Sequence, residues 1–219
     1  MIPAGPLPLW VRGYRLVFGV LDIVAMGWQF FHGSHGDPFK QANFFSFFTI
    51  QSNIIAAVVL LIGASGLPFV ARPTRQWDLV RGAAAIYLTL TFIVFALLLS
   101  TITEELQTTI PWVNDVVHRI VPLVLIADFL LVPLSRRITF RQSLVWMIYP
   151  LLWLGYTLVR AQIVDWYPYP FLDPAQSGGW PGVTAACVAI LLGFVAVCWV
   201  MTCIGGILTD RTTERGTTA

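Results

Sequence analysis

Six long apolar runs limit the folds available to this chain. They cover approximately residues 11–31, 45–68, 80–101, 113–134, 143–161 and 183–208. An α-helix needs about 20 such residues to cross a membrane, because the hydrocarbon core is roughly 30 Å thick and a helix rises about 1.5 Å per residue. The linkers between the runs leave no room for a soluble domain. We therefore predict an all-α integral membrane bundle of six transmembrane helices, forming a single domain over residues 1–219.

The composition agrees with this prediction and excludes several classes of protein. Hydrophobic residues make up 57% of the 219 positions and charged residues only 11%, too few to cover the surface of a soluble domain of this size. The net charge of +2 gives no basic surface for nucleic acid. The three cysteines, Cys187, Cys198 and Cys203, lie in the last run at spacings that match no metal or redox motif. We expect no metal and no cofactor.

The basic residues predict the orientation of the bundle. One side carries ten of them: Arg12, Arg15, Arg72, Arg75, Arg81, Arg136, Arg137, Arg141, Arg211 and Arg215. The other side carries three, Lys40, Arg119 and Arg160. The positive-inside rule therefore places both the N- and the C-terminus in the cytoplasm. Twelve of the thirteen basic residues are arginine, which indicates a GC-rich genome and favours a bacterial plasma (inner) membrane.

Polar residues gather near the outer end of two of the predicted spans. In the stretch FFTIQSN, Thr49 and Asn53 are separated by four residues and share a helical face, with Ser52 beside them. In the fourth span Asn114 and His118 have the same spacing. Polar side chains inside a membrane are costly, so each stripe indicates either packing between helices or a working cavity.

The two polar stripes are predicted to lie at nearly the same depth in the membrane. A rise of about 1.5 Å per residue puts Thr49 about 6 Å below the outer edge of its span and His118 about 7 to 8 Å below the edge of its own. A hydroxyl and an imidazole at matched depth suit nucleophilic acyl chemistry, in which a base takes the proton of the alcohol. The neighbouring amides of Asn53 and Gln51 are candidate donors to an oxyanion. The alternative is that these side chains bond only to backbone or to a neighbouring helix.

Two acidic residues lie deeper in the predicted spans. Asp22 is near the middle of the first, and Asp128 is in the inner half of the fourth, about 15 Å along the helix axis from His118. That separation excludes Asp128 as the direct partner of His118. We expect Asp22 and Asp128 to form either a buried network with Arg15, Tyr87 or Tyr156, or a proton path.

The outer ends of the spans carry candidate substrate-binding residues. Tyr156 and Arg160 share one face of the fifth span, and Arg119 adjoins His118. Each arginine has three possible roles: pairing with an acidic neighbour, reaching the lipid phosphates, or holding the carboxylate of a lipid substrate. The linker DWYPYPFLDPAQSGGWPG, residues 165–182, is too rich in proline for a regular helix. We expect it to form either an ordered cap over the outer mouth or a simple aromatic belt.

Three motifs give the chain a resemblance to a known family. FFTIQSN at the head of the second span, NDVVHRIVP at the head of the fourth, and YPLLWLGYTLVR leading to WYPYPFLDP resemble the androgen-induced-protein and androgen-dependent TFPI-regulating-protein family. The resemblance implies six spans and a threonine hydrolase that cleaves fatty acid esters of hydroxy fatty acids. By motif, Thr49 resembles the nucleophile and His118 the base. The eukaryotic pattern differs at Gln51, Ser52 and Asn53, and at Asp115.

These observations lead to one main hypothesis and two alternatives. The first is a membrane-embedded lipid ester hydrolase in which Thr49 attacks the ester and His118 moves the proton, with Asn53, Gln51, Ser52 and Asn114 in support. The second is a transporter or channel for a small amphiphile in which Asp22, Asp128 and His118 carry protons. The third is a non-catalytic lipid- or quinone-binding protein. The sequence does not predict the oligomeric state.

Overall fold

The computed structural model describes residues 7–33, 38–71, 73–100, 110–132 and 134–217, and this part of the chain is helical without any strand. The first half contains α1 (Leu9–Gly33), α2 (Pro38–Phe44), α3 (Phe48–Ser65), α4 (Pro68–Ala71), α5 (Arg75–Val94) and the π turn η1 (Phe95–Leu99). The second half contains α6 (Pro111–Asp115), the π turn η2 (Val116–Ile120), α7 (Val121–Leu131), α8 (Phe140–Ser143), η3 (Leu144–Met147), α9 (Ile148–Val164), η4 (Pro170–Leu172) and α10 (Trp180–Thr217). The predicted all-α class is confirmed.

Five helical segments are long and apolar enough to cross a membrane. They are Leu9–Gly33, Phe48–Ser65, Arg75–Leu99, Phe140–Val164 and Trp180–Asp210, and each overlaps one of the predicted spans. The remaining predicted span corresponds to the continuous helical stretch formed by α6, η2 and α7. This stretch is not among the five, and it carries Asp115, Arg119 and Asp128. The long apolar helices are those of a membrane-embedded protein.

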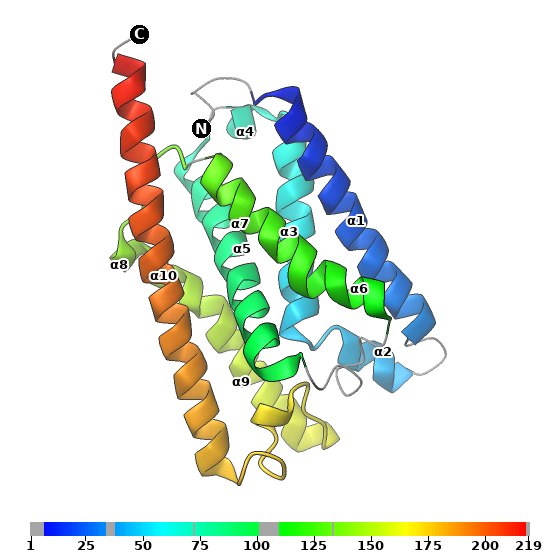
Figure 1. Ribbon diagram of the computed structural model, residues 1–219. Coiled ribbons are helices and arrows are strands. Elements are labelled where there is room, and N and C mark those ends of the chain that lie inside the picture. The colour runs from blue at the N-terminus through cyan, green and yellow to red at the C-terminus, as the bar shows by residue number, and fades with distance from the viewer. Residues whose placement is uncertain (1–6, 34–37, 72, 101–109, 133, 218–219) are drawn as a thin grey trace.

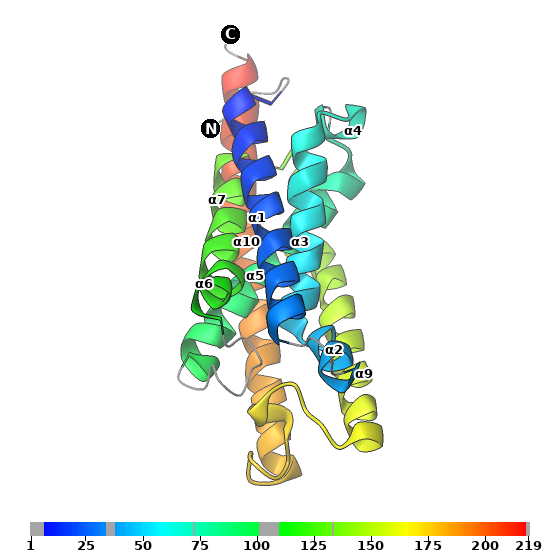
Figure 2. The same ribbon diagram turned by 90° about the vertical axis from the view of Figure 1, so that its right-hand side faces the viewer.

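The core of the molecule is a bundle of α1, α3, α5 and the α6–η2–α7 stretch. Helices α1 and α3 lie side by side along most of their length (Figure 2). Gly19 permits this approach, because a Cβ atom there would lie only 3.0 Å from the Leu61 side chain. Helix α10 packs against α5, and α9 lies on the outside (Figure 1).

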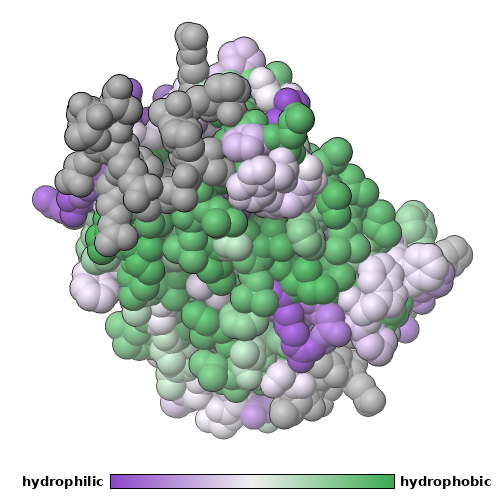
Figure 3. All heavy atoms as spheres, turned by 45° about the horizontal axis from the view of Figure 1, so that its top comes forward, coloured by the Kyte–Doolittle hydropathy of each residue, from purple (hydrophilic) through white to green (hydrophobic). Residues whose placement is uncertain are grey.

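Large hydrophobic side chains cover the outside of the bundle. Leu152 and Ile163 on α9 and Leu192 and Trp199 on α10 are all more than half exposed. Hydrophobic residues also dominate the face drawn in Figure 3. A surface of this kind suits lipid as the surrounding solvent, because water would penalise so much exposed apolar area.

The ends of α1 and α10 that carry the chain termini lie at the same end of the molecule (Figure 1). At this end two arginines from the orientation count, Arg15 and Arg81, are buried instead of lying at the surface. Arg15 donates to the two Asp128 oxygens at 2.6 and 3.1 Å, and Arg81 donates to Asp128 at 3.0 Å. Tyr14 also donates to Asp128. Arg72 and the side chains of Arg211 and Arg215 lie outside the described residues.

The prediction of one buried network for both acidic residues is wrong for Asp22. This side chain is fully buried, and neither carboxylate oxygen has a hydrogen-bond partner within the described ranges. It lies seven residues, or about 10 Å, along α1 from Arg15, which is too far for both acids to share that guanidinium. The two tyrosines proposed for the network bond elsewhere: Tyr87 donates to the Trp146 carbonyl at 2.9 Å, and the Tyr156 hydroxyl lies 3.1 Å from that of Ser46.

Candidate active site

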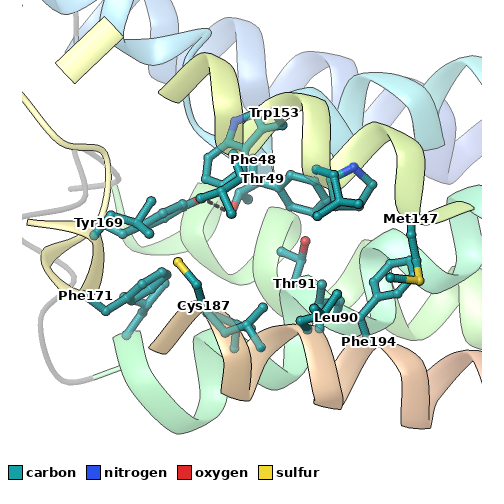
Figure 4. A pocket seen from close by; sticks show the side chains of 18 residues that line it. Phe48, Thr49, Leu90, Thr91, Met147, Trp153, Tyr169, Phe171, Cys187 and Phe194 are labelled. Atoms are coloured by element: carbon teal, nitrogen blue, oxygen red, sulfur yellow. Dashed lines mark hydrogen bonds between the residues drawn. The ribbon is translucent and has the colours of Figure 1, made fainter. Parts of the chain in front are cut away.

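An apolar cavity of about 110 Å³ runs from the start of α3 and the loop after α9 toward the middle of the bundle, with Met147 and Phe194 at its inner part. It is lined by α5, α9, α10, the start of α3 and the loop after α9 (Figure 4). The described wall is mostly aliphatic and aromatic, and its hydroxyl groups belong to Thr49, Thr91 and Tyr169. A cavity of this character suits a hydrocarbon chain that ends at one polar group.

Thr49 is positioned by the first turn of α3. A helix begins with backbone N–H groups that have no partner inside the helix, and Phe47 at the cap supplies no side-chain bond to them. Tyr169 takes that place: the Thr49 N–H donates to the phenol oxygen at 3.3 Å, and the Thr49 Oγ lies 3.4 Å from the same atom. Figure 4 shows the two side chains meeting at the cavity wall. The Thr49 hydroxyl and a phenol are thus in contact at an apolar site.

Tyr169 is a residue that the sequence analysis did not single out. Its ring is packed among Phe47, Trp153 and Phe171, with centroids 5.7, 5.9 and 5.2 Å away. Burial raises the pKa of this phenol above its ordinary value, so it stays protonated at neutral pH. For the linker 165–182 we expected either an ordered cap or a simple aromatic belt, and the contribution of Tyr169, Phe171 and Leu172 to the cavity wall favours the cap. The sequence does not reveal which of its rings turns inward.

Asn53 joins the Thr49 segment to the His118 segment. Its Nδ2 donates to the Thr49 carbonyl at 2.8 Å and to the Val117 carbonyl at 3.1 Å. The second bond has its cause in Pro122. In a π turn each N–H donates to the carbonyl five residues back, so residue 122 would donate to Val117. Because proline has no N–H, the Val117 carbonyl accepts from Asn53 instead. Both N–H groups of the Asn53 amide are therefore engaged, and neither points free toward an oxyanion.

The other polar residues of the FFTIQSN stretch also have protein partners. Ser52 donates to the Thr49 carbonyl at 3.0 Å, and its Oγ lies 3.3 Å from that of Thr91. Gln51 donates to the Phe45 carbonyl at 2.7 Å and accepts from the Tyr149 hydroxyl at 2.5 Å. Gln51 and Ser52 do not belong to the described cavity wall, so Thr49 is the residue of this stretch whose hydroxyl reaches it.

His118 lies in the π turn η2 and is almost fully buried. Its Nδ1 lies 3.2 Å from the Asn114 carbonyl. Because a carbonyl only accepts, this contact places the proton on Nδ1 and leaves the lone pair on Nε2, the tautomer required of a general base. The side-chain oxygen of Asn114, Oδ1, has no hydrogen-bond partner in the part of the chain that the structure describes.

The structure does not join His118 to Thr49. Within the described residues no hydrogen bond connects them, and the His118 ring instead stacks on Phe95 with centroids 4.1 Å apart. Phe95 opens the other π turn, η1. Two π turns therefore meet at this histidine, and such turns frequently occur at functional sites.

The predicted substrate-binding residues do not reach the described cavity wall. Arg119 forms an ion pair with Asp115 on the same helix and lies over the Phe95 ring at 5.4 Å. Arg160 donates to the Asn43 side chain at 2.7 Å, and Tyr156 is 48% exposed. Each arginine has a protein partner, so neither guanidinium group is placed to bind a substrate carboxylate in this structure.

Comparisons with protein-family models, with curated proteins and with solved structures gave no significant match.

Proposed function

We propose that this protein is a membrane-embedded lipid ester hydrolase with Thr49 as its nucleophile. The observation that carries the proposal is the place of Thr49: its hydroxyl lies on the wall of an otherwise apolar cavity, at the start of α3. The positive end of the α3 dipole and the first-turn N–H of Thr49, which bonds to the Tyr169 phenol in this structure, favour the negative charge that develops when an ester is attacked. The apolar wall receives the acyl chain. Fatty acid esters of hydroxy fatty acids fit this chemistry and the family resemblance.

His118 is the general base of the proposed reaction. Its Nε2 carries the lone pair, and the Asn53 bridge holds its segment next to that of Thr49. When an ester binds, the ring leaves Phe95 and turns toward the Thr49 hydroxyl. Hydrogen bonds of this kind are often long or misaligned in the absence of substrate.

We further propose that the chain crosses the membrane six times with both termini in the cytoplasm. The α6–η2–α7 stretch is the sixth span, with its charged side chains turned to partners inside the protein or at the interface. Both termini are cytoplasmic, so the cavity opens toward the outer leaflet of a bacterial plasma membrane. The substrate then arrives from lipid, and no metal or organic cofactor takes part.

The decisive experiment compares Thr49→Ala with Thr49→Ser in purified protein. The readouts are hydrolysis of a panel of fatty acyl esters and covalent labelling by a fluorophosphonate probe. We expect labelling at residue 49 and turnover in the wild type, retention of part of both in Thr49→Ser, and loss of both in Thr49→Ala. Thr89→Ala is the matched control, because that hydroxyl bonds to the Ala85 carbonyl of its own helix and lies away from the cavity. Full turnover by Thr49→Ala excludes the proposal, and Ser52 is then the next candidate.

A specific observation favours a second candidate, proton-coupled transport. Asp128 is held by Arg15, Arg81 and Tyr14, whereas Asp22 is buried with no hydrogen bond to either oxygen among the described residues. Asp22 is thus the proton carrier that this candidate requires. It predicts a pH-dependent flux of a small amphiphile into liposomes that Asp22→Asn abolishes. Saturable lipid binding with neither flux nor turnover supports the third candidate, a lipid- or quinone-binding protein.

A further inference from the structure

We propose that Tyr169 is a further catalytic residue of this site, donating a hydrogen bond to the oxyanion formed when Thr49 attacks an ester. This inference rests on the proposed hydrolase function. Its basis is the contact of one phenol with two groups of the nucleophile, the backbone N–H at 3.3 Å and the Oγ at 3.4 Å. No other described side-chain hydroxyl on the cavity wall approaches Thr49 within hydrogen-bond distance.

The position of the phenol fits that of an oxyanion donor. In the tetrahedral intermediate, the former carbonyl oxygen and the Thr49 Oγ are bonded to the same carbon, so they lie close together. A donor 3.4 Å from Oγ therefore reaches the oxyanion with a small movement. The Thr49 N–H points to the same place, since it already bonds to the phenol oxygen. The oxyanion would thus receive one backbone N–H and one phenol O–H, a pair of donors typical of acyl-transfer sites.

The surroundings of Tyr169 favour a donor over a base. The side chain is 5% exposed, and burial raises the pKa of the phenol, so its proton is retained at neutral pH. Three aromatic rings fix the ring in place, which means that little reorganisation accompanies the reaction. Either hydroxyl can donate in the 3.4 Å contact with the resting Thr49 Oγ, and donation by the phenol leaves the threonine proton for the base.

The proposed reaction follows the two stages of an ordinary ester hydrolysis, acylation of Thr49 and then its release by water. The bond between Thr49 Oγ and the carbonyl carbon forms, the π electrons move to the carbonyl oxygen, and the hydroxyl proton passes to His118 Nε2. When the intermediate collapses, the bond to the leaving alcohol breaks and His118 returns the proton to it. Water then attacks the acyl-threonine in the same way, and the carboxylic acid leaves. Tyr169 keeps its own proton throughout.

The first test is Tyr169→Phe, with Tyr149→Phe as the matched control. Tyr149 is another phenol, partly buried and bonded to Gln51, but it lies outside the described cavity wall. We expect kcat to fall about 10²- to 10³-fold in Tyr169→Phe, the cost of one oxyanion donor, with little change in KM. The control should keep its kcat. If Tyr169→Phe keeps its kcat while Thr49→Ala abolishes turnover, Tyr169 is structural and the hydrolase proposal stands. Full turnover by Thr49→Ala overturns both.

A second test separates donation from packing and does not depend on whether Tyr169→Phe folds. 3,5-Difluorotyrosine at position 169 preserves the ring and its hydroxyl but ionises at a lower pH. Because a phenolate cannot donate, the alkaline limb of the kcat profile should move to lower pH. The same replacement at Tyr167, which accepts from Gln162 at 3.0 Å in the same loop, should leave the profile unchanged. An unshifted profile at position 169 contradicts a role as donor.

Discussion

The two ends of the helix bundle both bury polar residues, but they do so in different ways. At the end that carries the termini, Asp128 is bonded to two arginines and a tyrosine, with charged hydrogen bonds of 2.6 to 3.1 Å to the arginines. At the opposite end, Thr49 and Tyr169 are neutral, meet at 3.3 to 3.4 Å and border a cavity. A network of charged hydrogen bonds holds helices together, whereas loosely bonded hydroxyls on a cavity wall can exchange partners. Stability and chemistry are therefore expected at opposite ends.

The largest expected effect is on turnover and comes from Thr49→Val. The substitution keeps the shape of the side chain but removes the nucleophile, so ester turnover should fall at least about 10³-fold. The lost contact with Tyr169 is long, so the free energy of unfolding should fall by only about 1 kcal/mol or less. Turnover is measured on a fatty acyl ester, and stability in a denaturing-detergent titration. A large loss of stability would show that this hydroxyl is a packing element after all.

The reverse pattern is expected for Asp128→Asn. Removing this charge leaves two buried guanidinium groups without their carboxylate, which should cost about 3–5 kcal/mol of unfolding free energy. Turnover per folded molecule should be unchanged, because Asp128 lies far from the cavity end. Asp210→Asn is the control, since its pairing with Arg137 is exposed and 3.8 Å long. If Asp128→Asn folds normally and loses turnover, the separation of the two ends does not hold.

Hydrophobic runs predict the helices of this fold well because crossing lipid requires length and apolarity. Each long helix overlaps a predicted span, with ends differing by a few residues except at the C-terminal end of α10. The exception is the stretch of α6, η2 and α7, which carries three charged residues, Asp115, Arg119 and Asp128, and is not among the five candidate spans. The charges are accommodated through partners such as Arg15, and these partners come from other helices. One chain read in order does not reveal such pairings.

The site was less predictable for a similar reason. Helix rise gives depth, and the Asn53 bridge places the Thr49 and Val117 segments side by side as equal depth suggested. Depth does not give rotation about the helix axis, however, and the His118 ring lies on Phe95. Tyr169 was missed because it reaches Thr49 from a loop 120 residues away along the chain. Loop conformation depends on the helices on which it packs, so periodicity carries no information about it.

A smaller effect on stability and turnover is expected from changing Asn53, which links the Thr49 and Val117 segments. Asn53→Ala leaves the Val117 carbonyl without its donor and should cost about 1–3 kcal/mol of unfolding free energy. Turnover should fall by up to about 10²-fold, because the segments of Thr49 and His118 lose their alignment. Ser65→Ala, which removes an exposed hydroxyl bonded to its own helix at 2.6 Å, is the control. Loss of stability with full turnover would mean that Asn53 does not align the catalytic pair.

The smallest effect is expected from Arg119→Gln, although Arg119 adjoins His118. The guanidinium is 50% exposed and already paired with Asp115 one turn away, so water screens the interaction and its contribution should be about 0–1 kcal/mol. KM should also stay within about twofold of the wild type, because exposed pairs of this strength hold little binding energy. The measurement compares an ester that carries a free carboxylate with its neutral methyl ester. If Arg119→Gln raises KM about tenfold for the first ester only, the arginine leaves Asp115 to bind the substrate. The substrate-binding site then includes this exposed arginine at the surface of the bundle.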